Sequence, residues 1–234
     1  MAWQASPDNS ATFPTALAIM LQALFLALRD LLRKNRFRLQ PSNRLVLPPS
    51  SRRGMKKATI KLGGTDNCLV VGEDVQLTNC EIRLDGLHNR IEIGPGVRFR
   101  SGKIYLRNTC GQHIRIGAQT TVEGAYLLVD EAASIDIGRD CMLSTDILIR
   151  TGDKHSILDL NSGERLNHSR DVRIGDRVWI GRDVQVLKGS VLLPESVVGA
   201  CSVVSRPFER GNCVIAGVPA RIVRQGVRWD RALH

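Results

Sequence analysis

The residues best suited to chemistry lie in one polar stretch, IRTGDKHSILDLNSGERLNHSRDVRIG. His155 is the residue in it that could transfer a proton, because an imidazole titrates near neutral pH and serves as a general base. Asp153 and Glu164 are candidates to orient that imidazole, and Asn167 and His168 could touch a substrate. Each could equally be a solvated loop residue, so its role depends on the elements that position it.

Those elements follow a six-residue rhythm. An aliphatic residue recurs at every sixth position on either side of the stretch, in a series formed by Ile137, Leu143, Ile149, Ile174, Ile180, Val186, Leu192, Val198 and Val204. Such a rhythm predicts a three-sided solenoid, in which each hexad supplies one short strand and one turn and points its aliphatic residue inward. The next position after Ile149 falls on His155, where the regularity is lost. We therefore expect a loop near residues 153–171 that leaves one corner and makes a cleft, with His155 at its rigid root.

Earlier hexads belong to the same solenoid. Four copies of one phrase, VVGEDVQL, IEIGPGVRF, IRIGAQTTV and IDIGRDCML, recur at spacings of 22, 23 and 21 and are led by Val71, Ile93, Ile116 and Ile137. These spacings fit coils of three hexads with a short bulge at one corner. We expect about seven coils over residues 58–208, with a helix and basic linker in residues 1–57 and a basic C-terminal cap in residues 209–234.

The positive charge is concentrated at the two ends of the chain. The formal net charge is +10, and residues 1–57 carry 10 Lys and Arg against 2 Asp and Glu. Basic ends can hold an anionic partner or can simply be solvated. Residues 14–34 are predicted to form a helix whose apolar run is too short to span a bilayer. We expect this helix to cap the first coil. The alternative is peripheral membrane contact through residues 14–38, backed by the basic sequence RKNRFR.

Composition limits the cofactors, the partners and the compartment. The six cysteines are scattered, and the Cys, His and acidic residues do not cluster as zinc ligands. We therefore expect no metal, reduced thiols and a cytoplasmic protein, with the inner face of the membrane as the alternative location. Aromatic residues make up 4% of the chain. The basic ends lack the interleaved aromatic residues of a nucleic-acid stacking platform, so we expect no nucleic-acid partner.

The second half of the chain resembles a known family. The segments IGDRVWIGRDVQVLKGSVLLPESVVGACSVVSR and CVIAGVPARIVR are similar to the hexapeptide-repeat acyltransferases. The segment from Cys141 to Gly181 most resembles bacterial sugar and capsular polysaccharide O-acetyltransferases, including those acting on polysialic acid. The resemblance implies an all-β fold, a left-handed parallel β-helix. It also implies a homotrimer that transfers an acetyl group from acetyl-CoA to a sugar hydroxyl of a bacterial surface polysaccharide (capsule or O-antigen) or of its precursor.

The same resemblance implies roles for individual residues. It makes His155 the general base that deprotonates the acceptor, and it puts Trp179 beside the thioester, where its indole N–H could stabilise the oxyanion. The acetyl-CoA groove would lie between adjacent subunits and be lined by Trp179, Arg182, Ala200, Cys201, Ser205, Arg206, Arg221 and Arg224. Position 201 is usually glycine in this family. The polysialic acid enzymes carry tyrosine where this chain has Ser205, so the identity of the acceptor sugar does not carry over.

Other functions are compatible with the repeat. An N-acetyltransferase acting on an amino sugar nucleotide would share the fold, the donor and the base. A non-catalytic solenoid scaffold would need none of the site residues. Related solenoids with three zinc-binding histidines are carbonic anhydrases, but the close histidine pair that they need is absent from this sequence. Serine acetyltransferases carry a longer helical N-terminal domain than residues 1–57 allow.

Overall fold

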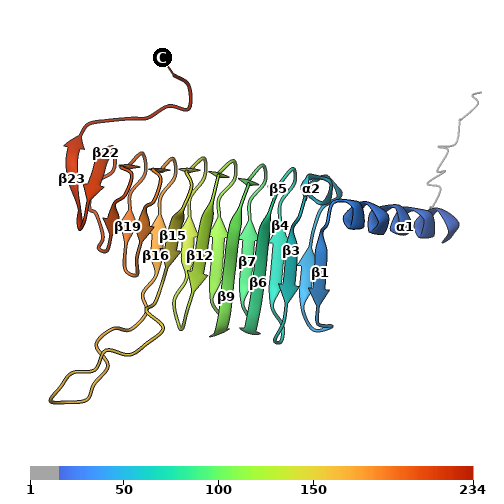
Figure 1. Cartoon of the computed structure of the whole chain (residues 1–234), viewed down its shortest axis with the longest axis horizontal. Helices are drawn as coiled ribbons and strands as arrows, with labels where there is room; N and C mark the ends of the chain where they lie inside the picture. The colour runs from blue at the N-terminus through green and yellow to red at the C-terminus, as the bar shows by residue number, and fades with distance from the viewer. Residues whose placement is uncertain (1–15, 234) are drawn as a thin grey trace, which may run out of the picture.

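The chain winds into a three-sided solenoid of parallel strands, with a helix at one end and a tail at the other (Figure 1). The structure is a computed structural model that describes residues 16–233, with side chains from Met20 onwards. Strands that neighbour one another in each sheet come from successive coils, and the longest sheets hold eight strands. The six-residue rhythm therefore predicts the architecture correctly, and the solenoid has about one coil more than expected.

Three sheets form the walls, and they are named here in the order in which the chain visits them. Sheet I holds β1 (Arg36–Leu39), β3 (Thr59–Leu62), β6 (Cys80–Leu87), β9 (Gly102–Cys110), β12 (Ala125–Val129), β15 (Ile147–Arg150), β18 (Gln185–Val186) and β21 (Val203–Val204). Sheet II holds β2 (Arg44–Val46), β4 (Cys68–Val71), β7 (Arg90–Ile93), β10 (His113–Ile116), β13 (Ile135–Ile137), β16 (Val172–Ile174) and β19 (Val191–Leu192). Sheet III holds β5 (Gln76–Leu77), β8 (Arg98–Phe99), β11 (Thr121–Val122), β14 (Met142–Leu143), β17 (Trp179–Ile180), β20 (Val197–Val198), β22 (Cys213–Gly217) and β23 (Ala220–Gln225).

The leading aliphatic residues form the core by stacking in register. Ile93 pairs with Val71 on one side and with Ile116 on the other, and each is no more than 2% exposed. The small residue after each lead lets neighbouring corners approach closely. A Cβ atom on Gly117 would lie 2.4 Å from the backbone of Gly138 in the next coil, so no larger residue fits there.

The first coil begins earlier than the boundary that we expected at residue 58. β1 and β2 pair in register with the second coil, and the short helix α2 (Pro49–Gly54) takes the place of the third strand. Phe37 and Leu45 are the inward residues of this coil and are only partly buried. The prolines and arginines of this segment hide the rhythm, because a terminal coil has a neighbour on one side only.

Helix α1 (Ala16–Leu32) does not cover the first coil as the capping prediction requires. It extends away from the end of the solenoid, and only its last turn is tied to the body (Figure 1). The Asp30 carboxylate forms an ion pair with Arg52 (2.6 Å), and the Asn35 side chain donates to Asp30 (3.2 Å) and to the carbonyl oxygen of Met55 (3.3 Å). None of the described helices has the length and apolar character needed to span a bilayer.

The C-terminal segment is only partly the cap that we expected. β22 continues sheet III beyond residue 208, and β23 closes that sheet by pairing antiparallel to β22. The rest of the tail turns back along the outside of the coils (Figure 1). Arg231 fastens it there, because its guanidinium donates to Thr121 Oγ1 (2.9 Å), to the Cys141 carbonyl oxygen (3.0 Å) and to the Asp140 carboxylate (3.1 Å).

A ladder of buried asparagines stabilises the corner between sheets I and II. Asn67 is 1% exposed, and its amide donates to the carbonyl oxygens of Gly63 (2.7 Å) and Gly86 (3.0 Å). Its Oδ1 accepts a hydrogen bond from the backbone N–H of Asn89 (2.9 Å), and Asn43 accepts one from the N–H of Asn67 in the same way (2.8 Å). Each asparagine thereby holds the turn of the following coil.

Replacing Asn67 by alanine should destabilise the solenoid, because the change removes three hydrogen bonds to the backbone and leaves the buried N–H of Asn89 without a partner. An unsatisfied buried group costs about 1–3 kcal/mol and each further lost hydrogen bond about 0.5–1.5 kcal/mol, so we expect the free energy of unfolding to fall by about 2–5 kcal/mol and Tm by roughly 5–15 °C. Thermal unfolding followed by circular dichroism measures this. Gln76→Ala, at an exposed position of β5, is the control and should change Tm by less than about 2 °C. An Asn67 variant as stable as the control would contradict the role of the ladder.

Candidate active site

The loop that interrupts the rhythm is where the sequence predicts it. β15 ends at Arg150 and β16 begins at Val172, so the inserted loop spans residues 151–171 and leaves the corner between sheets I and II (Figure 1). Within it the chain doubles back, and the N–H of Leu166 donates to the carbonyl oxygen of Ile157 (2.8 Å). The loop therefore projects from the solenoid wall as a narrow hairpin.

Asn167 closes the root of this loop. It is 7% exposed, and its amide donates to the Asp153 carboxylate (2.9 Å) and to the carbonyl oxygen of His155 (2.8 Å). Lys188, one coil further on, donates to the same carboxylate (2.5 Å) and to the Asn167 carbonyl oxygen (2.9 Å). The hydrogen bond from Lys188 and then that from Asn167 lower the pKa of Asp153. Asn167 thus holds the backbone of His155 in place, a structural role where we expected a contact with substrate.

The side chain of His155 is exposed to solvent. Its imidazole has no hydrogen-bond partner among residues 20–233. The Asp153 carboxylate reaches His155 only through Asn167 and the backbone, and the exposed side chain of Glu164 makes no hydrogen bond within the described part of the chain. Neither carboxylate orients the imidazole in the isolated protomer. His168 is exposed as well, so its contact with substrate stays a prediction.

Trp179 forms one wall of a hollow on the outer surface of sheet III. The residue begins β17 and is 38% exposed, and the hollow has a volume of about 420 Å³. Trp229 of the tail packs against Trp179, with ring centroids 6.2 Å apart, and donates its indole N–H to the carbonyl oxygen of Arg177 (2.6 Å). The indole N–H of Trp179 has no partner among the described residues and is available to a ligand.

Three arginines line this hollow, and none of them was predicted as a site residue. Arg231 is fastened to the coils, and Arg100 lies 3.4 Å from the Glu123 carboxylate. Arg98 is exposed and has no ion-pair partner in residues 20–233. The hollow thus presents positive charge that is only partly neutralised, next to Trp179. The sequence VRFR (residues 97–100) could have indicated two of them, because alternate residues of a strand point to the same face and Arg98 and Arg100 therefore both point outward.

The residues predicted for the acetyl-CoA groove are all exposed but lie in separate places. Trp179 lies on sheet III, and Arg182, Ala200 and Cys201 lie at the corner between sheets III and I. Ser205 and Arg206 lie at the corner between sheets I and II, and Arg221 and Arg224 lie on β23. Cys201 has φ 57, in the left-handed region that favours glycine, which is a physical reason why glycine is usual there. A second hollow of about 690 Å³ follows the corner between sheets III and I, beside Arg182 and Asp146.

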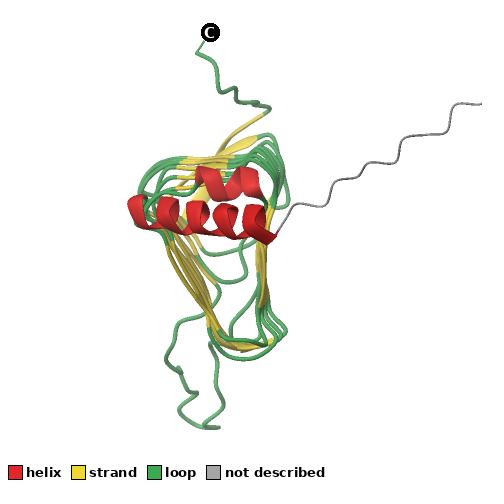
Figure 2. Cartoon of the chain, turned by 90° about the vertical axis from the view of Figure 1, so that its right-hand side faces the viewer, coloured by secondary structure: helices red, strands yellow, loops and turns green. Residues whose placement is uncertain are grey.

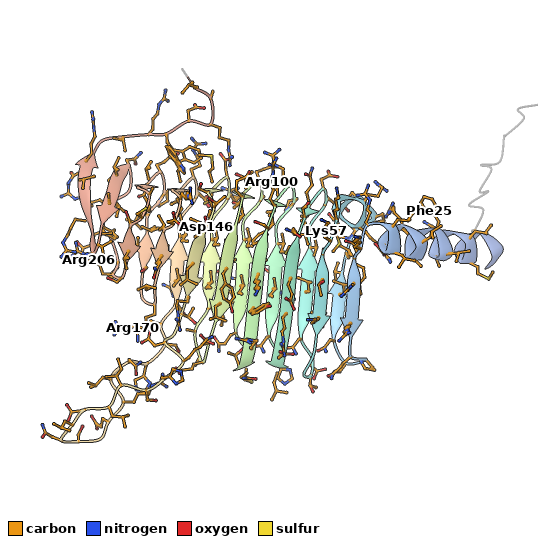
Figure 3. All side chains as sticks on the ribbon, in the orientation of Figure 1. Phe25, Lys57, Arg100, Asp146, Arg170 and Arg206 are labelled. Carbon is orange, nitrogen blue, oxygen red and sulfur yellow. The ribbon has the colours of Figure 1, made fainter. Side chains whose placement is uncertain are left out.

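A single chain does not bring His155 and Trp179 together. The inserted loop leaves the corner between sheets I and II, whereas Trp179 lies on sheet III against the tail. The loop and the tail lie on opposite sides of the solenoid in both views (Figures 1 and 2). Arg100, beside the hollow, and Arg170, near the end of the loop, are likewise at opposite edges (Figure 3). The two predicted catalytic residues therefore lie on opposite sides of a single protomer.

Comparison with known proteins identifies relatives of the same architecture. No family model matches the chain. The polysialic acid O-acetyltransferase of Neisseria meningitidis is 37% identical over 171 residues, which are 73% of this chain and 79% of the relative. The solved structure of the polysialic acid O-acetyltransferase OatWY is 30% identical and superposes with a TM-score of 0.76, over 86% of this chain and 92% of that one. The polySia-specific acetyltransferase NeuO is 29% identical with a TM-score of 0.72, over 85% and 86% of the two chains.

These relatives are enzymes, and their similarity extends over most of the solenoid, which argues against a purely structural scaffold. The all-β solenoid, the loop at one corner and the sequence similarity agree with one another. The chain therefore belongs to the hexapeptide-repeat acyltransferases, whose fold is a left-handed parallel β-helix, and among them it is similar to the bacterial polysaccharide O-acetyltransferases.

Proposed function

We propose that this chain is an acetyl-CoA-dependent O-acetyltransferase that modifies a sugar hydroxyl of a bacterial surface polysaccharide or of its precursor, with His155 as general base. The observation that carries the proposal is the exposed imidazole of His155 on a backbone pinned by Asn167, in a chain whose relatives are named polysaccharide O-acetyltransferases. The chemistry that we propose uses no metal ion.

The proposed reaction needs one base and one oxyanion donor. Acetyl-CoA supplies the acetyl group as a thioester. The His155 imidazole accepts the proton of the acceptor hydroxyl as the hydroxyl oxygen attacks the thioester carbonyl. The indole N–H of Trp179 is our candidate to donate to the oxyanion that develops on that carbonyl oxygen. As the C–S bond breaks, the His155 imidazolium protonates the departing thiolate, so the base returns to its neutral form.

Two features support a donor groove along the edge of sheet III. The residues that follow β14, β17 and β20 are Ser144, Gly181 and Gly199, which leave a low edge on which the narrow pantetheine arm could lie. Arg221 and Arg224 are exposed on β23, the last strand of sheet III, and Arg221 is the nearer of the two to this edge. Guanidinium groups suit the phosphates at the nucleotide end of the donor.

We further propose that the active enzyme is a homotrimer with sites between protomers. Apolar side chains lie on the outer side of sheet I, where Tyr126 and Leu148 are partly exposed and cover Tyr105 and Leu128, which are already buried in the protomer. The two tyrosine rings meet edge to face, with centroids 5.4 Å apart. A closed ring of three prisms would bury this surface and bring the loop corner of one protomer beside sheet III of the next. That arrangement would join His155 to the Trp179 hollow of a neighbour.

We propose that the acceptor sugar is acidic and enters the hollow between Arg98, Arg100 and Trp179. The cationic lining supports this, because a carboxylate is the natural partner of an exposed arginine. Arg231 would hold the tail as the outer wall of the site.

We assign the reaction to the cytoplasm, with the inner face of the membrane as one place where it occurs. All six cysteines are free. Burial raises the pKa of the Cys80 thiol to about 12 and that of the Cys141 thiol to about 11, so these two thiols are unreactive at neutral pH. Such a set of thiols fits a reducing compartment.

Replacing His155 by alanine should lower kcat by about 10²–10⁴-fold, which is the range for loss of a general base. Release of free CoA thiol in the presence of polysialic acid, or of lipopolysaccharide-derived oligosaccharides, measures the rate. His88→Asn changes an exposed histidine at the same corner, three coils before the loop, and should retain wild-type activity with the same melting temperature. An alanine variant within a factor of a few of the control would remove His155 from the mechanism.

Two inactive variants should restore each other if the site lies between protomers. His155→Ala and Trp179→Ala protein are denatured together, refolded and compared with each variant refolded alone. Mixed trimers contain one interface with both residues intact, so we expect about a quarter of wild-type activity at equal proportions in a closed trimer. Light scattering reports the trimer mass. Mixtures that form trimers yet stay as inactive as the parents would place both residues in one protomer's site or outside the mechanism.

Removing Arg98 or Arg100 should weaken acceptor binding selectively. A lost charge-assisted hydrogen bond costs about 1.5–3 kcal/mol, so we expect KM for an acidic acceptor to rise by about 10–100-fold. The KM for acetyl-CoA should stay within about twofold of the wild-type value. Arg139→Ala, an exposed arginine on another corner, is the matched control. Equal increases in KM for both substrates would show that these arginines shape the fold and do not recognise the acceptor.

A further inference from the structure

Helix α1 presents an uncovered apolar face. The side chains of Met20, Leu21, Leu24, Phe25, Leu28 and Leu31 are between 53% and 73% exposed. Their spacing of three, four or one residues places them along one side of a helix. Large apolar patches of this kind are rare on soluble proteins and mark contact sites.

The orientation of this face is set by the last turn of the helix. Asp30 is 6% exposed and is held by Arg52, and the N–H of Asn35 donates to the Asp30 carbonyl oxygen (2.8 Å). The apolar side chains therefore cannot turn toward the first coil without breaking the partly buried ion pair between Asp30 and Arg52. The protomer itself offers this face no partner within the described residues.

Cations adjoin the apolar face. Leu32 at the end of α1 lines a hollow of about 300 Å³ together with Arg33, Lys34, Lys56 and Lys57, and no acidic side chain lines it. Over residues 20–57 the chain has ten Lys and Arg and one acid, Asp30, which is already paired with Arg52. Phe25 and Lys57 lie at the same end of the molecule, far from Arg170 of the inserted loop (Figure 3).

We propose that α1 and the adjoining cations dock the enzyme on an anionic lipid surface. An apolar stripe flanked by Lys and Arg is the combination that lies in a membrane interface, where the stripe enters the acyl region and the cations meet lipid phosphates. A second copy of the chain fits less well, because pairing two such faces would bring like charges together. The inference is independent of the proposed reaction and concerns where the enzyme works.

The test is flotation of the full-length protein with lipid vesicles, which needs no acetyl transfer. Vesicles of phosphatidylcholine alone are compared with vesicles that also contain phosphatidylglycerol. At about 0.1 M salt we expect the bound fraction to be at least about tenfold higher on the anionic vesicles, and to fall at about 0.5 M salt because screening weakens the attraction of the cations. Equal binding to both vesicle types, or no flotation with either, would overturn the proposal.

Paired variants separate the two parts of the surface. Leu24→Asp with Leu28→Asp removes the apolar face, and Lys56→Glu with Lys57→Glu reverses the cations. We expect each pair to reduce flotation by at least about tenfold. Arg139→Glu with Arg170→Glu makes the same charge change at exposed sites away from α1 and should bind as the wild type does.

Light scattering and circular dichroism on every variant show whether assembly and fold are intact. If the protein with Leu24→Asp and Leu28→Asp fails to assemble, the proposal is tested with the Lys56→Glu and Lys57→Glu protein alone. A wild type that does not float, together with an aspartate pair of reduced mass, would show that α1 joins copies of the chain and would overturn the proposal. Undiminished flotation of the charge-reversed pair would also overturn it.

Discussion

The structure depends on one constraint, which is that each coil stacks on the next with the same residue above its counterpart. Ile91 lies between Leu69 and Ile114, and all three are fully buried. A shift of one residue would turn the inward aliphatic side chains outward, because side chains alternate along a strand. The register therefore holds each corner in line from coil to coil, and a feature at one corner has a defined place along the axis.

The inserted loop uses this constraint to position His155, the general base that we propose. A loop of this length is mobile unless its ends are fixed, and here Asn167 ties the two ends to each other and Lys188 ties both to the next coil. The result is a histidine whose backbone is rigid and whose imidazole is exposed. The hollow on sheet III obtains its own rigidity in another way, from a tail that Arg231 and Trp229 fasten across several coils.

The solenoid and the loop could be predicted from the sequence because both depend on local spacing. Each hexad repeats one pattern, and His155 lies where the pattern stops. The sequence did not predict the first coil, because its inward residues Phe37 and Leu45 are flanked by arginines and prolines and are only partly buried. The arginines of the hollow and the return of the tail could not be predicted, because Arg98 and Arg231 are separated by more than a hundred residues of sequence and meet only once the coils are stacked. The exposed face of α1 contradicted the expectation of a cap, since apolar periodicity shows that a helix has an apolar side and does not show what covers it.

Because the coils stack in register, the position of the loop along the solenoid axis can change only by whole coils. Strands of neighbouring coils are about 4.8 Å apart, so gain or loss of one coil between α1 and β15 would move the loop by that amount and leave its corner unchanged. On an enzyme docked through α1, such a step would set how far from the bilayer a sugar is acetylated. Homologous chains with different coil numbers could thus act on different residues of a membrane-linked glycan without any change in their catalytic groups.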